Sequence, residues 1–501
     1  IHSMNTIPSL RSILKNKSSI LWILLLFGSI AFLLFGNLSS LPIREYDEAR
    51  NSINALEMAK DHQFMVTHYE GIPDLWNTKP PLMIWCQVLC IYLFGPGEFA
   101  IRFPSAFAGL LTCILVFIFC YEYLKNKILG VFSALVLVTL TGYMNFHGTR
   151  TGDYDALLTL FTTAACLSYY LHINKNNSGF LLLFFLFLSL SVLTKGVSGL
   201  LFLPALFIYT IFKKKLITLF HLREFYVGSI TFLFIALGYY LLREKINPGY
   251  FDAVFSNELG GRFLNTIENH SGDFLYYISN LIHGRLRFWY LLIPFGILIG
   301  FLDKKNPPLS DLTFFATLLV FSFLLIISFS QTKCYWYDIP LFPFFSILIS
   351  LGLNFIYGFY RNFKKHNISG IIRIICVLVI MFIFYEPLRT SLKRTLKTNE
   401  ETWDSQKYEI SHFLQSALKG KYNLDNFYLV HDGFPTHLLF YIRLLNDKGD
   451  HFSFKKAVEL LPGDRIIAHQ QEVFQEIEKN YTTKILFSNK NVIAFQIEGY
   501  N

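Results

Sequence analysis

Two short charged segments near the beginning of the chain combine residue types that can do chemistry. The first, Glu45–Arg50 (EYDEAR), directly follows an apolar stretch, and the second, Asn77–Leu82 (NTKPPL), comes about thirty residues later. Ionisable side chains are costly beside a lipid bilayer, so they are kept there mainly at working sites. A carboxylate and a lysine in one loop between membrane helices therefore predict a site that handles a phosphate group and a proton.

Asp47 is the first candidate for a catalytic group, with Glu48 beside it. A carboxylate at the membrane edge can accept a proton from a hydroxyl group or a phosphate nucleophile, and its neighbours tune its pKa. The alternative is structural, because Asp47 could cap a helix expected over Glu48–Ala59. The spacing alone leaves both interpretations open. Tyr46 and Arg50, in the same segment, are predicted to contact the substrate.

Lys79 precedes Pro80 and Pro81, which fix the backbone and open a helix. A lysine at a helix N-terminus opposes the helix dipole, which is unfavourable unless an anion binds between them. The alternative is a lysine whose aliphatic part covers apolar surface while its ammonium group reaches water. Arg262 is the second candidate for a phosphate contact, because a guanidinium group matches phosphate in a bidentate manner.

Asp153 and Asp155 open a later apolar helix, close to Arg150. Acidic residues at a helix N-terminus suit the helix dipole, so a structural role would also account for them. The functional interpretation is a second carboxylate that faces Asp47. Arg150 is counted with the phosphate-binding candidates, because a bound anion would explain basic residues on this side of the membrane.

Two downstream loops, 243–285 and 331–338, carry further polar and aromatic residues. A lone histidine such as His270 is more often structural than functional. The aromatic residues of the second loop would form either an interfacial belt or a platform on which a sugar stacks. The candidates for substrate contacts in these loops are Glu258, His270, Lys333, Tyr335 and Tyr337.

The composition indicates which elements must position these residues. The chain has 501 residues, of which 53% are hydrophobic, 17% aromatic and only 16% charged, against about 25% charged residues in a typical soluble domain. Apolar stretches of transmembrane length recur along it. The sequence predicts a mainly α polytopic membrane protein with eleven spans, over 18–39, 99–120, 128–148, 154–173, 178–194, 197–212, 225–242, 286–302, 312–330, 337–358 and 369–386.

Basic residues fall in alternate loops, which the positive-inside rule assigns to the cytoplasm. This pattern accounts for most of the net charge of +9, so nucleic acid is not an expected partner. It places the N-terminus inside and the candidate residues outside. The apolar stretch 81–95 would invert this order as a span, so we expect an interfacial helix on the outer face; a short true span is the alternative. The basic loop residues are Arg11, Lys15, Lys17, Lys125, Lys127, Lys175, Lys213, Lys214, Lys215, Arg223, Lys304, Lys305, Arg361, Lys364 and Lys365.

Beyond residue 387 the apolar runs shorten and the charges increase. The patterns predict helices over 404–418, 434–445 and 470–480, and strands over 426–431, 464–468, 484–488 and 491–497. We therefore expect three regions. They are a cytoplasmic N-terminal segment, 1–17, with an expression scar at 1–3 before Met4; a transmembrane domain, 18–386, with a catalytic outer loop at 40–98; and an extracytoplasmic α/β domain, 387–501. The seven cysteines show no metal-binding spacing and are expected to be small buried apolar groups.

Seven segments, in order along the chain, resemble the membrane-embedded GT-C glycosyltransferases, and among them the lipid A aminoarabinose transferases and protein O-mannosyltransferase-like enzymes. The resemblance covers about residues 15–360. The segments are EYDEAR at 45–50, TKPPL at 78–82, GEFAIRFPSAFAGLL at 97–111, GDYDALLTLF at 152–161, LTKG at 193–196, NELGGRF at 257–263 with HSGDFLYYI at 270–278, and KCYWYDIPLFP at 333–343.

The resemblance implies an inverting transfer of a sugar from a polyprenyl (undecaprenyl) phosphate carrier, at the outer face of the bacterial inner membrane. By position in the motifs, Asp47 matches the catalytic base or acceptor-orienting group. Asp155 matches a second acid, whose role Asp153 could share. Lys79 and Arg262 match the residues that hold the carrier phosphate, and Tyr337 matches an aromatic residue before a proline-containing span.

The chain also departs from the family pattern. Thr78 stands where related enzymes often have glutamate, and Trp336 stands where they often have histidine. These differences leave the acceptor open, and no metal site is predicted, although a divalent metal is not excluded. The expected partners are the lipid-linked donor, membrane lipids, and lipid A or a related glycolipid as acceptor, with the protein acting as a monomer.

Two other functions were weighed against this one. Transfer to a protein or to a growing glycan is the first alternative, because the domain at 387–501 could dock such an acceptor. A secondary transporter or flippase is the second, but it would need charges at mid-membrane and broken helices. The charges of this chain are predicted at the outer edge.

Overall fold

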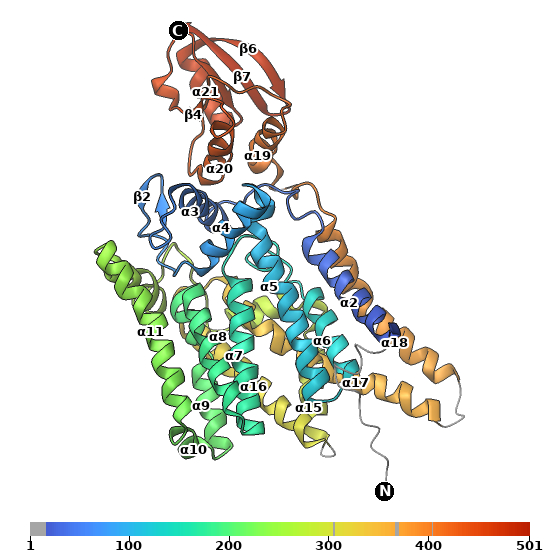
Figure 1. Ribbon diagram of the computed structural model, residues 1–501. Helices are drawn as coiled ribbons and strands as arrows, with labels where there is room; N and C mark the ends of the chain where they lie inside the picture. Colours follow the sequence, from blue (N-terminus) through green and yellow to red (C-terminus); the bar gives the residue numbers. More distant parts are fainter. Residues whose placement is uncertain (1–16, 304–305, 366–369, 403) are drawn as a thin grey trace.

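The computed structural model describes residues 17–303, 306–365, 370–402 and 404–501. Figure 1 shows a body of long helices with a small α/β domain at one end, which contains the C-terminus. The predicted fold class, a mainly helical polytopic protein with a C-terminal α/β domain, is confirmed. The predicted scar at 1–3, the rest of the N-terminal segment up to residue 16, and the loop residues Lys304 and Lys305 lie outside the described residues.

Each of the eleven predicted spans contains a helix. Among the described residues, seven helices are long and apolar enough to cross a membrane alone, and an eighth arises if a pair bent by 100° counts as one span. The protein is therefore a multi-pass membrane protein. The helices within the predicted spans are α2 (Lys17–Phe35), α5 (Glu98–Ile118), α6 (Lys127–Thr139), α7 (Asp155–Lys175), α8 (Ser178–Lys195), α9 (Leu203–Phe212), α11 (Arg223–Ile246), α15 (Leu292–Leu302), α16 (Pro307–Phe329), α17 (Phe342–Lys365) and α18 (Gly370–Thr395).

The helix in the predicted span 128–148 is much shorter than the sequence predicts. Helix α6 ends at Thr139 instead of continuing to residue 148. Beyond it, the Gly142 amide donates a hydrogen bond to the Arg285 carbonyl at 2.9 Å. A Cβ atom at Gly142 would lie 2.4 Å from the ring of Phe342, so only glycine allows this close approach. As a result, residues 140–154 form a loop, and His147 lies in that loop rather than in a membrane helix.

Above the spans, a layer of short elements carries the charged segments. Helix α3 (Asp47–Asp61) and helix α4 (Leu82–Phe94) lie there with a small antiparallel hairpin (Figure 1). Helix α4 has 13 residues and is among the short apolar helices. The other elements of the hairpin and of the connecting loops are β1 (His68–Tyr69), β2 (Ile72–Pro73), η1 (Phe119–Tyr123), η2 (Gly196–Leu200), α10 (Leu216–Phe220), α12 (Tyr250–Val254), η3 (Phe255–Leu259), α13 (Gly261–Leu264), α14 (Tyr276–Asn280), η4 (Leu281–Arg285), η5 (Arg287–Trp289) and η6 (Tyr335–Leu341).

The C-terminal domain contains a five-stranded mixed sheet with the order β4-β3-β5-β7-β6. Strand β3 pairs in parallel with β4 and β5, and β7 pairs antiparallel with β5 and β6. The predicted helices and strands are all present, and the sequence patterns missed only the short strand β4 and the turn η7. The elements are α19 (Ser405–Leu418), β3 (Phe427–Leu429), α20 (Thr436–Asn446), β4 (Phe452–Phe454), η7 (Ala457–Glu459), β5 (Arg465–Ala468), α21 (Gln471–Asn480), β6 (Tyr481–Asn489) and β7 (Val492–Tyr500).

This domain rests on the outer layer that carries the charged segments. Helix α20 packs against α3, and one apolar core runs through both. The Tyr441 hydroxyl accepts a hydrogen bond from the Ile43 amide at 2.9 Å and donates one to Glu98 at 2.9 Å. Arg443 forms an ion pair of 2.6 Å with the buried Glu57 of α3. The contacts join the C-terminal domain to the loop that precedes Asp47.

Candidate active site

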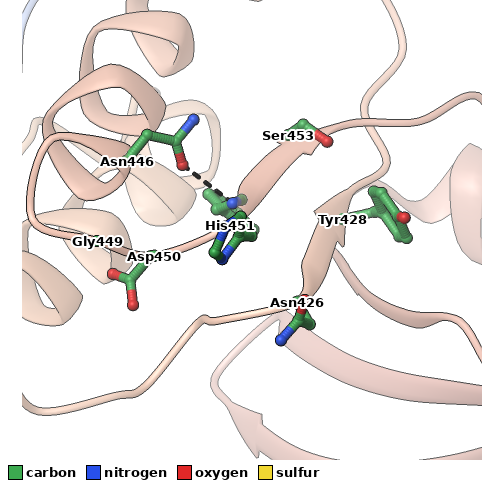
Figure 2. A pocket seen from close by; sticks show the side chains of 8 residues that line it. Asn426, Tyr428, Asn446, Gly449, Asp450, His451 and Ser453 are labelled. Carbon is green, nitrogen blue, oxygen red and sulfur yellow. Dashed lines mark hydrogen bonds between the residues drawn. The ribbon is translucent and has the colours of Figure 1, made fainter.

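A cavity of about 1220 Å³ lies between the spans and the outer layer, and the charged segments meet in it. A smaller cavity of about 520 Å³ lies apart from these segments, in the C-terminal domain (Figure 2). Only the larger cavity therefore concerns the predicted site. The sequence-predicted residues that line it are Tyr46, Asp47, Arg50, Lys79, Asp155, Glu258, Arg262, His270 and Tyr337.

Asp47 is the first residue of α3, and its side chain does not cap that helix. The cap residue is Tyr46, whose φ of 66° and ψ of −114° are strained for a residue with a side chain, and no side-chain hydrogen bond closes the helix end. The Asp47 side chain is 55% exposed, and it lines the cavity. The capping role considered for Asp47 is therefore not observed, and strained backbone of this kind occurs often at functional sites.

The surroundings of Asp47 keep its carboxylate charged. The protein around the cavity partly desolvates the Asp47 carboxylate, which raises its pKa, but the neighbouring cationic groups outweigh this effect and the pKa lies below its usual value. The contributing groups are His147, Lys79, Lys195 and Arg262. Burial lowers the pKa of His147 to about 4, so His147 is neutral at neutral pH. The charges of Lys79, Lys195 and Arg262 also favour the ionised form of Asp47.

The cationic side chains of Lys79 and Arg262 face the cavity, and nearby carboxylates balance their charges only in part. Burial lowers the pKa of Lys79, and Glu258 and Asp47 oppose this effect. Within the described part of the chain, the Lys79 ammonium group has no carboxylate within 4.0 Å. Arg262 donates a hydrogen bond to the Tyr337 hydroxyl at 3.2 Å, and its carboxylate neighbour Glu268 is 3.9 Å away. Partly buried cations that are only partly balanced by carboxylates favour binding of an anion.

Asp155 is held by a lysine to which the sequence analysis gave no role. Lys195 Nζ lies 2.6 Å from Asp155 Oδ1 and 5.6 Å from the centre of the Tyr337 ring. Asp155 begins α7 and Lys195 ends α8, so the pair joins the ends of two neighbouring spans in the cavity wall. The available signal was the LTKG segment at 193–196, which the family resemblance contains.

His147 and Trp336 form a second feature that the sequence analysis missed. Their rings stack with centres 3.8 Å apart and planes at 8°, and both residues line the cavity. Trp336 is the residue that the sequence analysis noted as a departure from the motif it resembles. His147 comes from a different loop, yet it places an imidazole against this position. No sequence signal pointed to His147, because it fell at the end of a predicted span.

Asp153 lies behind the cavity wall instead of lining it. It is 2% exposed, accepts a hydrogen bond from Thr151 at 2.5 Å, and lies 3.5 Å from His147 Nδ1. Burial and the charges of Glu48 and Asp47 raise the pKa of Asp153 well above its usual value. Ligand atoms of Asp47, His147 and Asp153 lie within 4.8 Å of one another, so these residues could hold a divalent cation.

Glu48 is a structural residue in this geometry and lies outside the cavity. Its carboxylate binds Arg102 at 2.7 and 2.9 Å and accepts hydrogen bonds from the Gly152 and Arg44 amides, both at 2.8 Å. All of these groups are buried. Glu48 therefore joins α3 to α5 and to the loop before α7, and these contacts favour a structural role over the predicted catalytic one.

Arg150, Lys333 and Tyr335 are also placed outside the cavity. Arg150 donates hydrogen bonds to the carbonyls of Leu33, Leu34 and Gly36, at 2.9, 3.1 and 2.8 Å, and so caps the end of α2. Lys333 donates to the Ser328 and Ser330 carbonyls and caps the end of α16. The ring of Tyr335 lies 5.4 Å from the guanidinium carbon of Arg285. Arg150 and Lys333 thus use their charged groups within the protein, and none of the three residues lines the cavity, so their predicted roles at the substrate stay predictions.

The fold of the chain is similar to that of two solved membrane proteins. The chain aligns over 95% of its length with the crystal structure of ArnT from Cupriavidus metallidurans bound to undecaprenyl phosphate, with a TM-score of 0.69, 15% identity and 97% of that chain covered. The chain has the GT-C fold. It also aligns with the oligosaccharyltransferase of Archaeoglobus fulgidus, with a TM-score of 0.57, 12% identity and coverage of 97% of this chain and 74% of that one.

Sequence comparisons agree with this GT-C assignment. The model of the family "Dolichyl-phosphate-mannose-protein mannosyltransferase" matches residues 78–240. The undecaprenyl phosphate-alpha-4-amino-4-deoxy-L-arabinose arabinosyl transferase of Aeromonas hydrophila is 28% identical over 73% of this chain and 66% of its own length. That of Edwardsiella ictaluri is 27% identical over 66% of this chain and 58% of its own. The chain thus spans less than two thirds of the length of these relatives, and the resemblance inferred from the motifs is confirmed.

Proposed function

We propose that this protein is a glycosyltransferase that moves a sugar from an undecaprenyl phosphate carrier to lipid A or a related glycolipid. The observation that carries the proposal is the cavity in which Lys79 and Arg262 face Asp47. Cationic side chains bind phosphate by charge-assisted hydrogen bonds, and a carboxylate can orient or deprotonate an acceptor. The named relatives act on an undecaprenyl phosphate-linked sugar, which fits this arrangement.

The cavity combines a polar end with an apolar wall. A polyprenyl chain requires apolar surface, and the phosphate and sugar require the charged groups of the outer layer. This division would place the carrier tail along the spans and its phosphate between Lys79 and Arg262. The apolar lining includes Leu158, Val197, Leu201, Phe323, Ile326 and Ile327.

The chemistry follows from the positions of the charges. Negative charge develops on the carrier phosphate as the bond from its oxygen to the anomeric carbon breaks, and preorganised cations lower that barrier. The acceptor oxygen attacks the anomeric carbon from the opposite face, which inverts the configuration in one step. If the acceptor is a phosphate, it is already ionised and Asp47 orients it. If the acceptor is a hydroxyl group, Asp47 also takes its proton.

The membrane orientation belongs to the same proposal. The basic loops predict a cytoplasmic N-terminus in the bacterial inner membrane, with the cavity and the C-terminal domain on the periplasmic side. The C-terminal domain rests on the layer that carries Asp47, so both would lie on one side. Transfer to a protein acceptor stays a second candidate, because the matched family model is that of protein mannosyltransferases.

Transfer can be tested directly with purified protein. We expect that incubation with undecaprenyl phosphate-linked sugars and lipid A yields glycosylated lipid A, identified by its mass. Peptide acceptors in parallel reactions distinguish the second candidate. Failure to modify any lipid acceptor, with transfer to peptides, would replace the first proposal by the second.

We also expect donor binding to depend on the two cations of the cavity. Substituting Lys79→Gln or Arg262→Gln removes a charge-assisted contact to the phosphate, worth roughly 1.5–3 kcal/mol. The dissociation constant for undecaprenyl phosphate should therefore rise about 10- to 100-fold. Lys60→Gln, an exposed lysine of α3, is the matched control. Unchanged affinity in both cavity variants would show that the phosphate binds elsewhere.

A further inference from the structure

Phe434 is a residue of the C-terminal domain that lines the large cavity. It lies in the loop 430–435 between strand β3 and helix α20, and it is 47% exposed. Its ring lies beside that of Tyr46, which directly precedes Asp47, also lines the cavity and is 65% exposed. The two ring planes are at 10° to each other, with their centres 6.0 Å apart. Two exposed aromatic rings from distant parts of the chain therefore meet where the C-terminal domain rests on the outer layer (Figure 1).

Contacts within the C-terminal domain fix the loop that carries Phe434. The Asp432 amide donates a hydrogen bond to Gln470 Oε1 at 2.7 Å, and Gln470 Nε2 donates one to the Asp432 carbonyl at 2.9 Å. Gly433 has a φ of 94°, a conformation that favours glycine, and Pro435 occupies the cap position of α20. The backbone on both sides therefore holds the Phe434 ring at the cavity, although much of the ring is exposed.

The Tyr46 ring is positioned by its own backbone and by a lysine of the C-terminal domain. The φ of Tyr46 is 66°, which is strained for a residue with a side chain. Lys407 of α19 places its Nζ atom 5.8 Å from the centre of the Tyr46 ring and 2.5 Å from Glu45 Oε2. A cation at this distance is attracted to the face of an aromatic ring. The aromatic pair thus has one cation and one carboxylate beside it.

These surroundings favour a sugar ring over a lipid chain as the ligand of the pair. A sugar has an apolar face, which packs on an aromatic ring, and a polar rim, which binds charged side chains. Tyr46 and Phe434 offer the flat apolar surface, and Glu45 and Lys407 offer the charges. A lipid chain would instead follow the apolar residues that line the cavity along the spans. The sugar packs on the outside of the pair, because a ring inserted between two others would need them about 7 Å apart.

We propose that Tyr46 and Phe434 bind the sugar ring of the glycolipid acceptor, so that the C-terminal domain contributes to the choice of acceptor. This acceptor subsite rests on the proposed function, in which Lys79 and Arg262 bind the carrier phosphate and Asp47 orients the acceptor. Since Tyr46 is the neighbour of Asp47 in the chain, a sugar on the aromatic pair lies beside the group that orients it. Phe434 takes no part in the chemical step and acts by holding the acceptor.

Binding measured without a donor tests the subsite separately from the reaction. Dissociation constants of the full-length protein in detergent are determined by calorimetry for lipid A, for its deacylated sugar headgroup and for undecaprenyl phosphate. Phe434→Leu keeps an apolar side chain but removes the flat ring, so we expect about 10-fold weaker binding of lipid A and of the headgroup. Binding of undecaprenyl phosphate should not change. Phe434→Trp keeps an aromatic face and should bind all three ligands nearly as the wild type does.

Tyr500→Leu is the matched control, because Tyr500 is an exposed aromatic residue of the same domain that does not line the cavity. It should leave all three affinities unchanged. No binding of the headgroup to the wild type, equal headgroup affinity in Phe434→Leu, or an equal loss of undecaprenyl phosphate affinity would overturn the subsite. Sugar transfer by the wild type is measured in parallel. Transfer with unaltered headgroup binding in Phe434→Leu would overturn the subsite alone, whereas weakened binding without any transfer would overturn the proposed function and keep the subsite.

Discussion

Asp47→Asn is expected to abolish sugar transfer while leaving the carrier bound. Asparagine keeps the size of the side chain but removes the charge that orients or deprotonates the acceptor. Loss of a positioned general base lowers rates by roughly 10²- to 10⁴-fold. The substitution also removes a negative charge near Lys79 and Arg262, which makes the cavity more positive. Affinity for the anionic carrier should therefore be unchanged or increased.

Both quantities can be measured on one preparation, as the rate of transfer to lipid A and as the dissociation constant for undecaprenyl phosphate. Asp61→Asn is a suitable control, because Asp61 is an exposed residue at the other end of α3. It carries the same chemical change on the same helix and should leave both quantities near the wild-type values. Turnover of Asp47→Asn close to that of Asp61→Asn would remove Asp47 from the mechanism.

The sequence predicts the membrane helices and the C-terminal elements well because both depend on local patterns. Apolar runs of sufficient length form helices in lipid, and alternating patterns mark the strands of the small domain. Helix α6 is the instructive exception. Its apolar run continues past Thr139, but Gly142 packs against Phe342 and the chain leaves the helix. Such a contact between distant segments has no local signal.

The same holds for the site: the sequence indicates which residue types are present, but not which groups they contact. The motifs brought Asp47, Lys79, Asp155 and Arg262 to attention, and these residues meet in the cavity. Residue type could not distinguish a cation that faces a ligand from one that caps a helix, as Arg150 does. That distinction depends on which carbonyls lie nearby. The sequence does not show which side chains form ion pairs either. The LTKG motif contains Lys195 but does not indicate that Lys195 binds Asp155.

Asp47 and Glu48 are neighbours on α3, but one faces the cavity and the other faces the protein interior. The two carboxylates are adjacent in sequence and point to different surroundings. Glu48 is 1% exposed and faces α5, where Arg102 neutralises it, whereas the side chain of Asp47 is 55% exposed and lines the cavity. Burial raises the pKa of Glu48, but the contact with Arg102 lowers it by more, so the pKa lies below its usual value. Glu48 therefore stays charged at neutral pH.

This buried pair makes a strong prediction for stability. Arg102→Met leaves the charge of Glu48 buried without its partner, and breaking a buried ion pair in this way costs about 3–5 kcal/mol. It also removes the donors to the carbonyls of Leu38, Leu41 and Pro42, at 2.9, 2.7 and 2.6 Å. We expect a large fall in the thermal unfolding temperature of the detergent-solubilised protein.

The double variant Arg102→Met/Glu48→Gln separates the two causes. It removes the uncompensated charge but leaves the three carbonyls without donors, so it should be more stable than Arg102→Met alone. Arg389→Met is the control for the substitution itself, because Arg389 forms an exposed ion pair with Glu386, and such pairs contribute at most about 1 kcal/mol. A double variant no more stable than the single one would mean that the carbonyl contacts, and not the charge of Glu48, hold the loop before Asp47 in place.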